Sequence, residues 1–327
     1  MSGLRLFLLV LGPLPILGAS LAISSWARDS SRLAGPTNQV SAEDDFQQSR
    51  PAAKSSGQSA VGRESLEHAC QQVARHWKPR LGEECQLIVR EPLVIAGDMS
   101  SEELDRWYRE TIAPAVEGLQ ASYVDAELDH PVSVLLFASQ ESYTEHIREL
   151  FGDEDVSIFG YYKPGHRTLV MNISTGAGTL VHELTHALLD FDFPAVPVWF
   201  NEGLASLHEQ VRFGRRDDQV HLAGLDNWRL PILQRALERG RLPTLESLVC
   251  ADDFRLGRAS VNYAQARYFC LYLQEQGVLE LFYRQLRANH EHDPLGAETL
   301  FEVLPDHDWS SLEADFRRWV GERSFEA

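Results

Sequence analysis

The sequence has too few basic residues to suggest a nucleic-acid-binding protein. Its 327 residues include 30 Lys and Arg against 48 Asp and Glu, a formal net charge of −18. Binding to a phosphate backbone requires a basic surface, so no nucleic-acid partner is expected. The acidic balance indicates a well-solvated surface and says little about the fold.

Cysteine is also scarce, with four residues in the whole chain. None of them has the C-x-x-C spacing, so a zinc site built from cysteines is not expected. An even number is consistent with two disulfides in an oxidising compartment, and three pairings are possible. The pairing with the shortest loops joins Cys70 to Cys85 and Cys250 to Cys270.

Charged residues are absent from residues 6–27. A basic start, an apolar run and small residues at its end are typical of a signal peptide. The run is also long enough to span a bilayer, although two prolines interrupt it, so an uncleaved membrane anchor remains the alternative. With either outcome for residues 1–27, we expect an extracytoplasmic protein, periplasmic or secreted, with membrane attachment through residues 6–27 if the segment is retained.

The next segment, residues 28–65, is rich in Ser, Gln, Ala and Gly and poor in large apolar residues. Such a composition cannot bury enough surface to offset its ordering entropy, so we predict a disordered linker. The chain contains no internal repeat. Its hydrophobic content of 44% is enough for one large domain or two modest lobes.

Residues 66–215 are predicted to form an α+β lobe with a small mixed sheet, because strand and helix patterns alternate there. The expected helices are 66–77, 100–123 and 141–151, and the expected strands are 91–96, 131–138, 158–163 and 167–173. The nearly continuous apolar character of 131–138 predicts burial on both faces.

Strand patterns fade after Gln210, and helical patterns dominate. Helices are expected at 228–239, 243–250, 259–276, 278–289, 296–303 and 310–322. We therefore predict that residues 216–327 form a mainly helical C-terminal lobe packed against the first.

The chemistry is concentrated in His182-Glu183-Leu184-Thr185-His186, within an apolar run that predicts a helix. Residues four apart share one helix face, so His182 and His186 can bind the same zinc ion. Glu183 would then lie beside the metal, where a carboxylate can take a proton from an activated water. The apolar opposite face predicts that this helix is buried in the centre of the lobe.

A third ligand is expected because a catalytic zinc keeps three protein ligands and one open position. Glu202 lies sixteen residues after His186, on a predicted helix that starts near Pro197. Small residues follow it, which would let this helix approach its neighbour closely. We therefore predict one Zn²⁺ per chain, bound by His182, His186 and Glu202.

The stretches Val181–His186 and Trp199–Ala205 resemble those of the gluzincin metallopeptidases with a peptidase-MA-like domain. The resemblance implies a zincin-like lobe with a central active-site helix, a peptide or protein substrate, and Glu183 as the general base. The metzincin pattern is not met, because Leu189 and Asp192 stand where it requires Gly and His.

The same resemblance implies two further features. Gluzincins commonly use a downstream Tyr or His to stabilise the oxyanion, and Tyr263 is the first candidate for this catalytic role. The family fold also implies a strand edge that aligns the substrate backbone, for which residues 167–173 are the candidate.

These patterns predict an exported zinc metallopeptidase. One alternative is a catalytically silent zincin-like module that binds peptide without cutting it, although such a module would not need Glu183. Another is a zinc hydrolase that acts on a non-peptide amide or ester in the cell envelope.

Overall fold

The computed structural model describes residues 60–125, 128–153, 157–216, 219–250, 254–255, 258–305 and 308–325. The predicted signal or anchor segment 1–27 lies outside this part of the chain, as does most of the predicted linker. Helix α2 (Ala60–Trp77) nevertheless begins inside the segment predicted as linker. Among the described residues, no helix is both long and apolar enough to cross a membrane.

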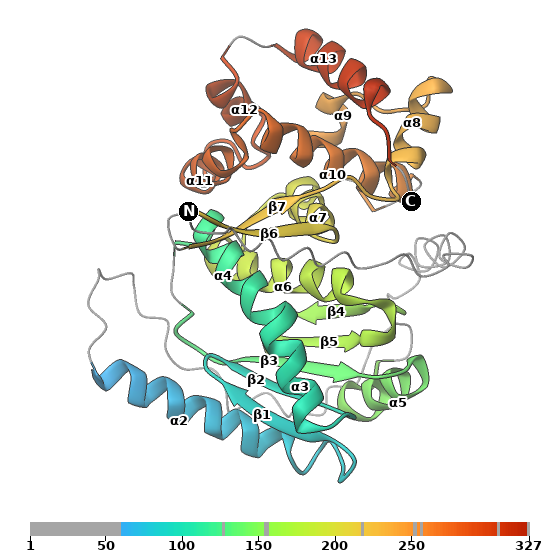
Figure 1. Ribbon diagram of the computed structural model, residues 1–327. Helices are drawn as coiled ribbons and strands as arrows, with labels where there is room; N and C mark the ends of the chain where they lie inside the picture. Colours follow the sequence, from blue (N-terminus) through green and yellow to red (C-terminus); the bar gives the residue numbers. More distant parts are fainter. Residues whose placement is uncertain are drawn as a thin grey trace, which may run out of the picture.

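The fold is α+β with a small mixed sheet, as predicted. The sheet has five strands in the order β1-β2-β3-β5-β4 (Figure 1). The strands are β1 (Gln86–Arg90), β2 (Leu93–Gly97), β3 (Val132–Phe137), β4 (Gly160–Lys163) and β5 (Thr168–Asn172). The central strands β2, β3 and β5 are parallel, and the edge strands β1 and β4 each run antiparallel to their neighbour.

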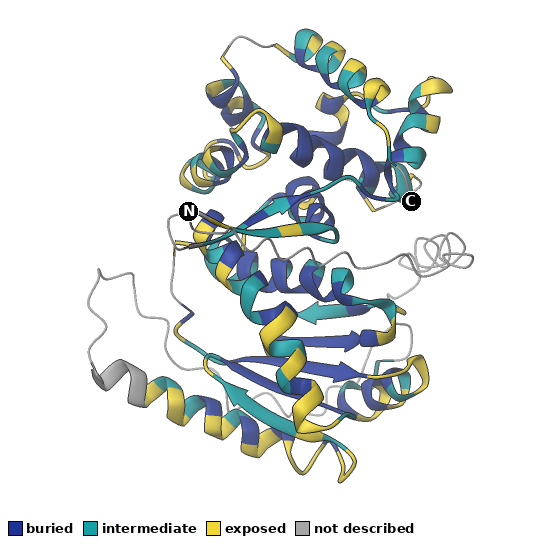
Figure 2. Cartoon of the chain, in the orientation of Figure 1, coloured by how far each residue is buried: buried dark blue, intermediate teal, exposed yellow. Residues whose placement is uncertain are grey.

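Helices cover both faces of the sheet, which explains why every residue of β3 is buried. Val134 faces one core with helix α6 (Ala177–Asp192), and Leu135 faces the other with α2 and α5 (Gln140–Phe151). Figure 2 shows the central strands as a buried layer between these helices. The prediction of a strand buried on both faces is confirmed.

The predicted helix over residues 100–123 is present, with a break in its regular bonding. Ser100 and Glu103 form the expected capping box before α3 (Ser101–Trp107). A π-helical turn (Tyr108–Ile112) then leads into α4 (Ala113–Ser122). Pro114 has no N–H to continue the α-helical ladder, which accounts for the irregular turn before it.

The sequence analysis missed a β-hairpin after Gln210. Strands β6 (Val211–Arg216) and β7 (Gln219–Gly224) pair antiparallel, where the strand pattern was expected to fade. The hairpin packs against α4 at Gly118, where an added Cβ would lie 3.0 Å from the Leu222 side chain. It crosses the predicted boundary between residues 215 and 216.

The predicted C-terminal helices are present beyond this hairpin. They are α8 (Leu230–Glu238), α9 (Leu245–Val249), α10 (Ala259–Glu275), α11 (Leu279–Asn289), α12 (Ala297–Val303) and α13 (Trp309–Glu322). Helix α7 (Val198–Leu207) packs with them in one large apolar core. In Figure 1 this helical part lies above the sheet, with α6, α7 and the hairpin between them.

The two predicted disulfides are not formed. All four cysteines are free thiols. Cys85 Sγ lies 3.6 Å from His146 Nε2 rather than against Cys70. Cys270 is buried on α10, close to α7: a Cβ added to Gly203 would lie 2.9 Å from the Cys270 sulfur. Cys250 is exposed.

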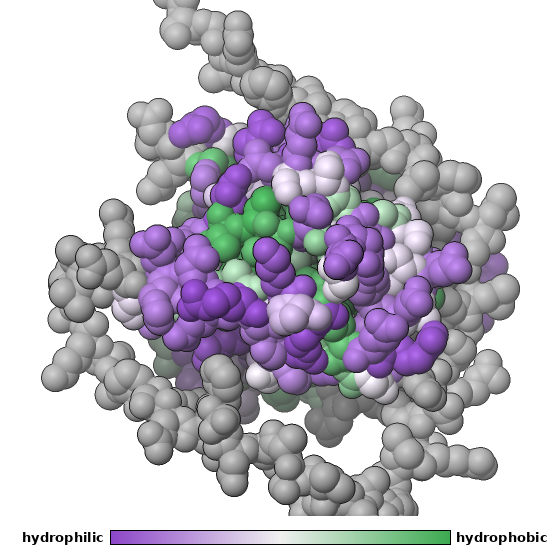
Figure 3. All heavy atoms as spheres, turned by 90° about the horizontal axis from the view of Figure 1, so that it is seen from below, coloured by the Kyte–Doolittle hydropathy of each residue, from purple (hydrophilic) through white to green (hydrophobic). Residues whose placement is uncertain are grey.

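The face of the molecule seen from below is largely hydrophilic, with apolar residues gathered toward its centre (Figure 3). In Figure 1 this is the end that carries α2, β1 and α5. Helix α6 lies on the other face of the sheet.

Candidate metal centre

Two neighbouring helices supply the predicted ligands. Helix α6 buries Leu180, Leu184 and Leu188 and presents His182 and His186 from its partly exposed side. Helix α7 follows after a short proline-containing turn, in which Pro197 takes the N-cap position. Because α6 and α7 pack together, the carboxylate of α7 reaches the histidines of α6.

The structure brings the three predicted ligands together. His182 Nε2 lies 3.1 Å from His186 Nε2, and the Glu202 Oε2 atom lies 3.7 Å from the first nitrogen and 3.6 Å from the second. Donor atoms of a tetrahedral zinc ion, each about 2.0–2.1 Å from the metal, are about 3.3 Å apart. His182, His186 and Glu202 therefore form a group that can hold a metal ion.

Asn201 sets the orientation of the His186 ring. Its side-chain Oδ1 lies 2.7 Å from His186 Nδ1, so the ring nitrogen donates to the amide oxygen. The hydrogen on Nδ1 leaves Nε2 with its lone pair directed at the centre. This second-sphere contact comes from the residue immediately before Glu202.

Glu209 lies beside Nδ1 of His182, as Asn201 lies beside Nδ1 of His186. Its Oε1 atom lies 3.3 Å from His182 Nδ1, and the same carboxylate accepts bonds from Arg229 at 2.6 and 2.9 Å. Burial alone would raise the pKa of Glu209, but Arg229 and His182 hold it well below its usual range. Glu209 is therefore ionised and lies against His182 Nδ1, which has no hydrogen-bond partner among the described residues.

These contacts indicate that the centre suits a cation. In the tautomer that places a hydrogen on each Nδ1, the two Nε2 lone pairs of His182 and His186 face each other across 3.1 Å. Such an arrangement is repulsive unless a proton or metal ion lies between the nitrogens. Two imidazoles and one carboxylate are a donor set that zinc prefers.

Glu202 divides its oxygens between the centre and a nearby arginine. While Oε2 faces the histidines, Oε1 lies 2.5 Å from Arg255 Nη2. Burial would raise the pKa of Glu202, but His186, His182 and Arg255 hold it well below its usual range. The carboxylate is thus ionised although its side chain is only 5% exposed.

Glu183 is held by the edge strand of the sheet. Its Oε2 accepts the main-chain N–H of Tyr162 at 2.9 Å, on β4. The strand edge beside the site is therefore β4, and the expectation for residues 167–173 is wrong. Those residues form β5, which pairs with β3 and β4 and has no free edge.

Tyr263 lies on α10, as expected, and near the centre. The Arg255 guanidinium contacts both its hydroxyl and the Glu202 carboxylate. The ring packs against Phe254 at 5.3 Å between centroids. Burial and the charge of Glu202 raise the pKa of the Tyr263 hydroxyl, which keeps it neutral and able to donate a hydrogen bond.

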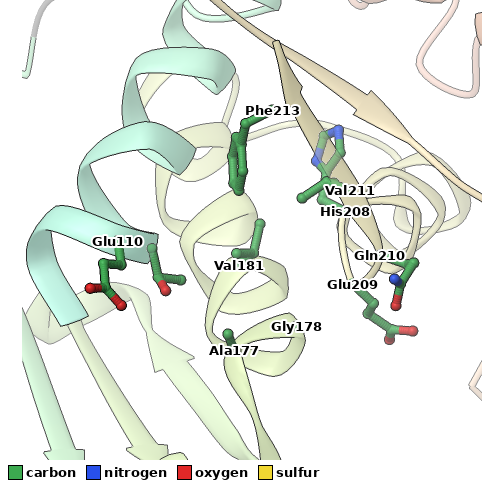
Figure 4. A pocket seen from close by; sticks show the side chains of 10 residues that line it. Glu110, Ala177, Gly178, Val181, His208, Glu209, Gln210, Val211 and Phe213 are labelled. Atoms are coloured by element: carbon green, nitrogen blue, oxygen red, sulfur yellow. The ribbon is translucent and has the colours of Figure 1, made fainter. Parts of the chain in front are cut away.

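A small pocket lies beside α6, lined by residues that include Glu110, Val181, His208 and Phe213. Figure 4 shows Val181 and Phe213 pointing toward one another, with the Glu209 carboxylate turned away from them. His182 and His186 do not line this pocket, but Glu209, which contacts His182, does.

The sequence does not predict the roles of Asn201, Glu209, Arg229 and Arg255. Only Asn201 carries a local signal, because it adjoins Glu202 in the motif. The Asp190 Oδ2 atom on α6 accepts the Tyr162 hydroxyl at 3.0 Å.

Comparison with known proteins does not extend this assignment. No family model matches the sequence, and no curated protein matches it.

Proposed function

We propose that this protein is an exported zinc peptidase of the gluzincin type, with one Zn²⁺ held by His182, His186 and Glu202. The observation that carries the proposal is the convergence of these three donor atoms, which lie 3.1 to 3.7 Å apart. The helix that bears the histidines also bears Glu183, which is fixed by the backbone of a sheet edge.

When bound, zinc would supply Lewis acidity that makes a water molecule more acidic and polarises the carbonyl of the scissile bond. Glu183 would take the proton of the attacking water and pass it to the leaving amine. The main-chain bond from Tyr162 holds the Glu183 carboxylate in place for both transfers.

The open edge of β4 supports a peptide as substrate. Along β4, Gly160 and Tyr162 alternate with Tyr161 and Lys163. The main-chain N–H of Tyr162 points away from β5, toward Glu183. Because the Tyr162 N–H is bonded to Glu183, an extended peptide would add to this edge through the other outward-facing main-chain groups of β4. This arrangement would bring its backbone next to Glu183 and the metal.

Tyr263 would donate its hydroxyl hydrogen to the oxyanion, with Arg255 positioning it. Both residues lie on the side of the centre where Glu202 Oε1 is found. Tyr263→Phe should therefore lower kcat by about 10²-fold while zinc content stays unchanged. Equal loss of zinc and activity would instead assign Tyr263 a structural role.

Metal analysis tests the ligands. Compared with wild type, His186→Ala and Glu202→Ala should each contain one zinc ion fewer per chain. His68→Ala is the matched control, because His68 is exposed on α2. Wild-type zinc content in the His186→Ala and Glu202→Ala variants would reject the ligand assignment, and iron in place of zinc would reject the identity of the metal.

A peptide-library digest tests the reaction. Glu183→Gln should retain zinc and lose about 10²–10⁴-fold in rate, since it lacks the general base. Glu117→Gln, at an exposed position of α4, should cleave like wild type. Cleavage of amide or ester substrates but not peptides would favour an envelope hydrolase, and no hydrolysis by zinc-loaded wild type would favour a binding module.

A further inference from the structure

A second group of potential ligands lies on the opposite face of the sheet. Glu84 and Cys85 come just before β1, and His146 lies on α5. The Cys85 Sγ atom is 3.6 Å from His146 Nε2, and Glu84 Oε1 is 3.8 Å from the same nitrogen. Among the described residues, this is the group outside the first centre whose donor atoms lie close enough to share an ion.

The His146 ring is fixed in an orientation that suits a ligand. Its Nδ1 lies 2.8 Å from the main-chain oxygen of Ser142, which can only accept a hydrogen bond. Nδ1 therefore carries the hydrogen, and the lone pair of Nε2 is directed at Cys85 and Glu84. The ring stacks on Phe137 at 4.3 Å and 22°, and the residue is only 8% exposed.

The spacing of these atoms fits tetrahedral zinc. With a Zn–S bond of about 2.3 Å and a Zn–N bond of about 2.0 Å, the sulfur and nitrogen ligands lie about 3.5 Å apart. The observed 3.6 Å is close to this value, and the distances match those in the first centre. The Glu84 side chain is 64% exposed, so it can move the last few tenths of an ångström toward a metal.

The loop before β1 leaves room for the Glu84 carboxylate. Gly82 adopts a φ of +83°, and an added Cβ there would lie 2.5 Å from Glu84 Oε1. That same oxygen is the one that faces His146. A glycine at position 82 thus permits both the turn and the inward fold of the carboxylate.

The carboxylates of Glu84 and Asp98 both lie near Cys85 and would stabilise a bound cation.

We propose that Glu84, Cys85 and His146 bind a second Zn²⁺, which fastens the loop between α2 and β1 to helix α5. A cysteine, a histidine and a carboxylate provide donors that zinc accepts, with a fourth position open to water. This ion lies across the sheet from the peptidase centre and would hold the loop before β1 against α5. The proposal does not depend on the proposed function.

Cobalt substitution tests this site directly. A thiolate ligand gives Co²⁺ an intense charge-transfer absorption, whereas the His182, His186 and Glu202 centre contains no sulfur. Co²⁺-loaded full-length wild type should show this band and bind two ions per chain. Cys85→Ala and His146→Ala should lose the band and one ion, while His186→Ala should keep the band and lose the other ion.

Cys250→Ala is the matched control, because Cys250 is an exposed free thiol, and it should behave like wild type. Absence of the band in wild type, or its survival in Cys85→Ala, would overturn the proposal. If only the first centre is wrong, wild type still shows the band and binds one ion.

A thermal measurement covers the case in which Cys85→Ala folds poorly. In the His186→Ala background, zinc at 100 times its dissociation constant should stabilise the folded chain and raise Tm by several degrees. The milder Cys85→Ser change in the same background should abolish most of this rise. A Tm that does not respond to zinc in His186→Ala would contradict a metal at Glu84, Cys85 and His146.

Discussion

At the scale of single residues, the proposed zinc affinity depends on which nitrogen of each imidazole carries the hydrogen. Asn201 fixes this for His186 through a contact of 2.7 Å. Asn201→Ala should therefore weaken zinc binding about 10–100-fold, because the ring is free to rotate or to protonate Nε2 instead. Competition with a chromophoric chelator measures the change.

Asn289→Ala provides the control, since Asn289 ends α11 away from the centre and bonds to Glu302 at 3.1 Å. It should leave the zinc dissociation constant unchanged. If Asn201→Ala also leaves that constant unchanged while the protein stays folded, the orientation of His186 is set by packing alone.

His208 gives a prediction about pH. It is fully buried, with Nδ1 3.2 Å from Thr185 Oγ1, and burial lowers its pKa to about 3. The unfolded chain binds a proton at this residue below about pH 6.5, and the folded protein does not. The free energy of unfolding should therefore fall by up to about 1.4 kcal/mol per pH unit as the pH decreases below 6.5.

Urea unfolding at about pH 7.5 and about pH 5.5 isolates this contribution when wild type is compared with His208→Gln. The variant should lose less stability over that interval, by about 1 kcal/mol, whatever its stability at the higher pH. An equal loss in both proteins would show that His208 is protonated in the folded state.

At the scale of helices and strands, the close approach of α7 to α10 determines where Glu202 lies. The sequence predicted that small residues after Glu202 would serve the contact with α6, but Gly203 faces α10. An added Cβ at Gly203 would lie 2.8 Å from the Ala266 carbonyl oxygen. The close packing that positions Glu202 therefore comes from the C-terminal helices.

Gly203→Ala should accordingly destabilise the protein by about 1–3 kcal/mol and weaken zinc binding, because α7 must shift away from α10. Denaturant unfolding and chelator competition measure the two effects. Gly321→Ala, on α13, meets no atom within 4 Å and should be neutral or slightly stabilising. If Gly203→Ala matches Gly321→Ala in stability and zinc affinity, the backbone absorbs the extra methyl without moving Glu202.

The elements that sequence predicted well are those whose signals are local. The apolar run of β3, the capping box at Ser100 and the spacing of His182 and His186 all depend on neighbouring residues. The hairpin was missed because each strand has only one apolar face, with Phe213 and Leu222 among charged and small residues. Its stability comes from packing on α4, which no local pattern reports.

The candidate metal centre was likewise predicted only where its signals are local. The three expected ligands follow from the helical period and one proline-containing turn. Arg229 and Arg255 reach the centre from segments 20 or more residues beyond the motif, and their direction depends on tertiary structure. The choice of β4 over β5 as the edge strand likewise depends on strand order, which the sequence leaves open.

At the scale of the whole molecule, the C-terminal helices anchor the end of α6, the helix that bears His182 and His186. Asp192, the last residue of α6, accepts the Tyr283 hydroxyl at 2.6 Å and pairs with Arg287, both on α11. The Asp192 side chain is only 3% exposed. A carboxylate at a helix C-terminus is unfavourable by itself, so these partners offset its cost.

Arg287→Met should therefore destabilise the protein by about 3 kcal/mol, because it leaves a buried carboxylate without its cation. Adding Asp192→Asn should restore much of that loss, since the uncompensated charge is removed. Arg318→Met, in a pair whose side chains are 64% and 38% exposed, should change stability by less than about 0.5 kcal/mol. If Arg287→Met is as mild as Arg318→Met, helix α6 is anchored by the apolar packing of α11 rather than by this ion pair.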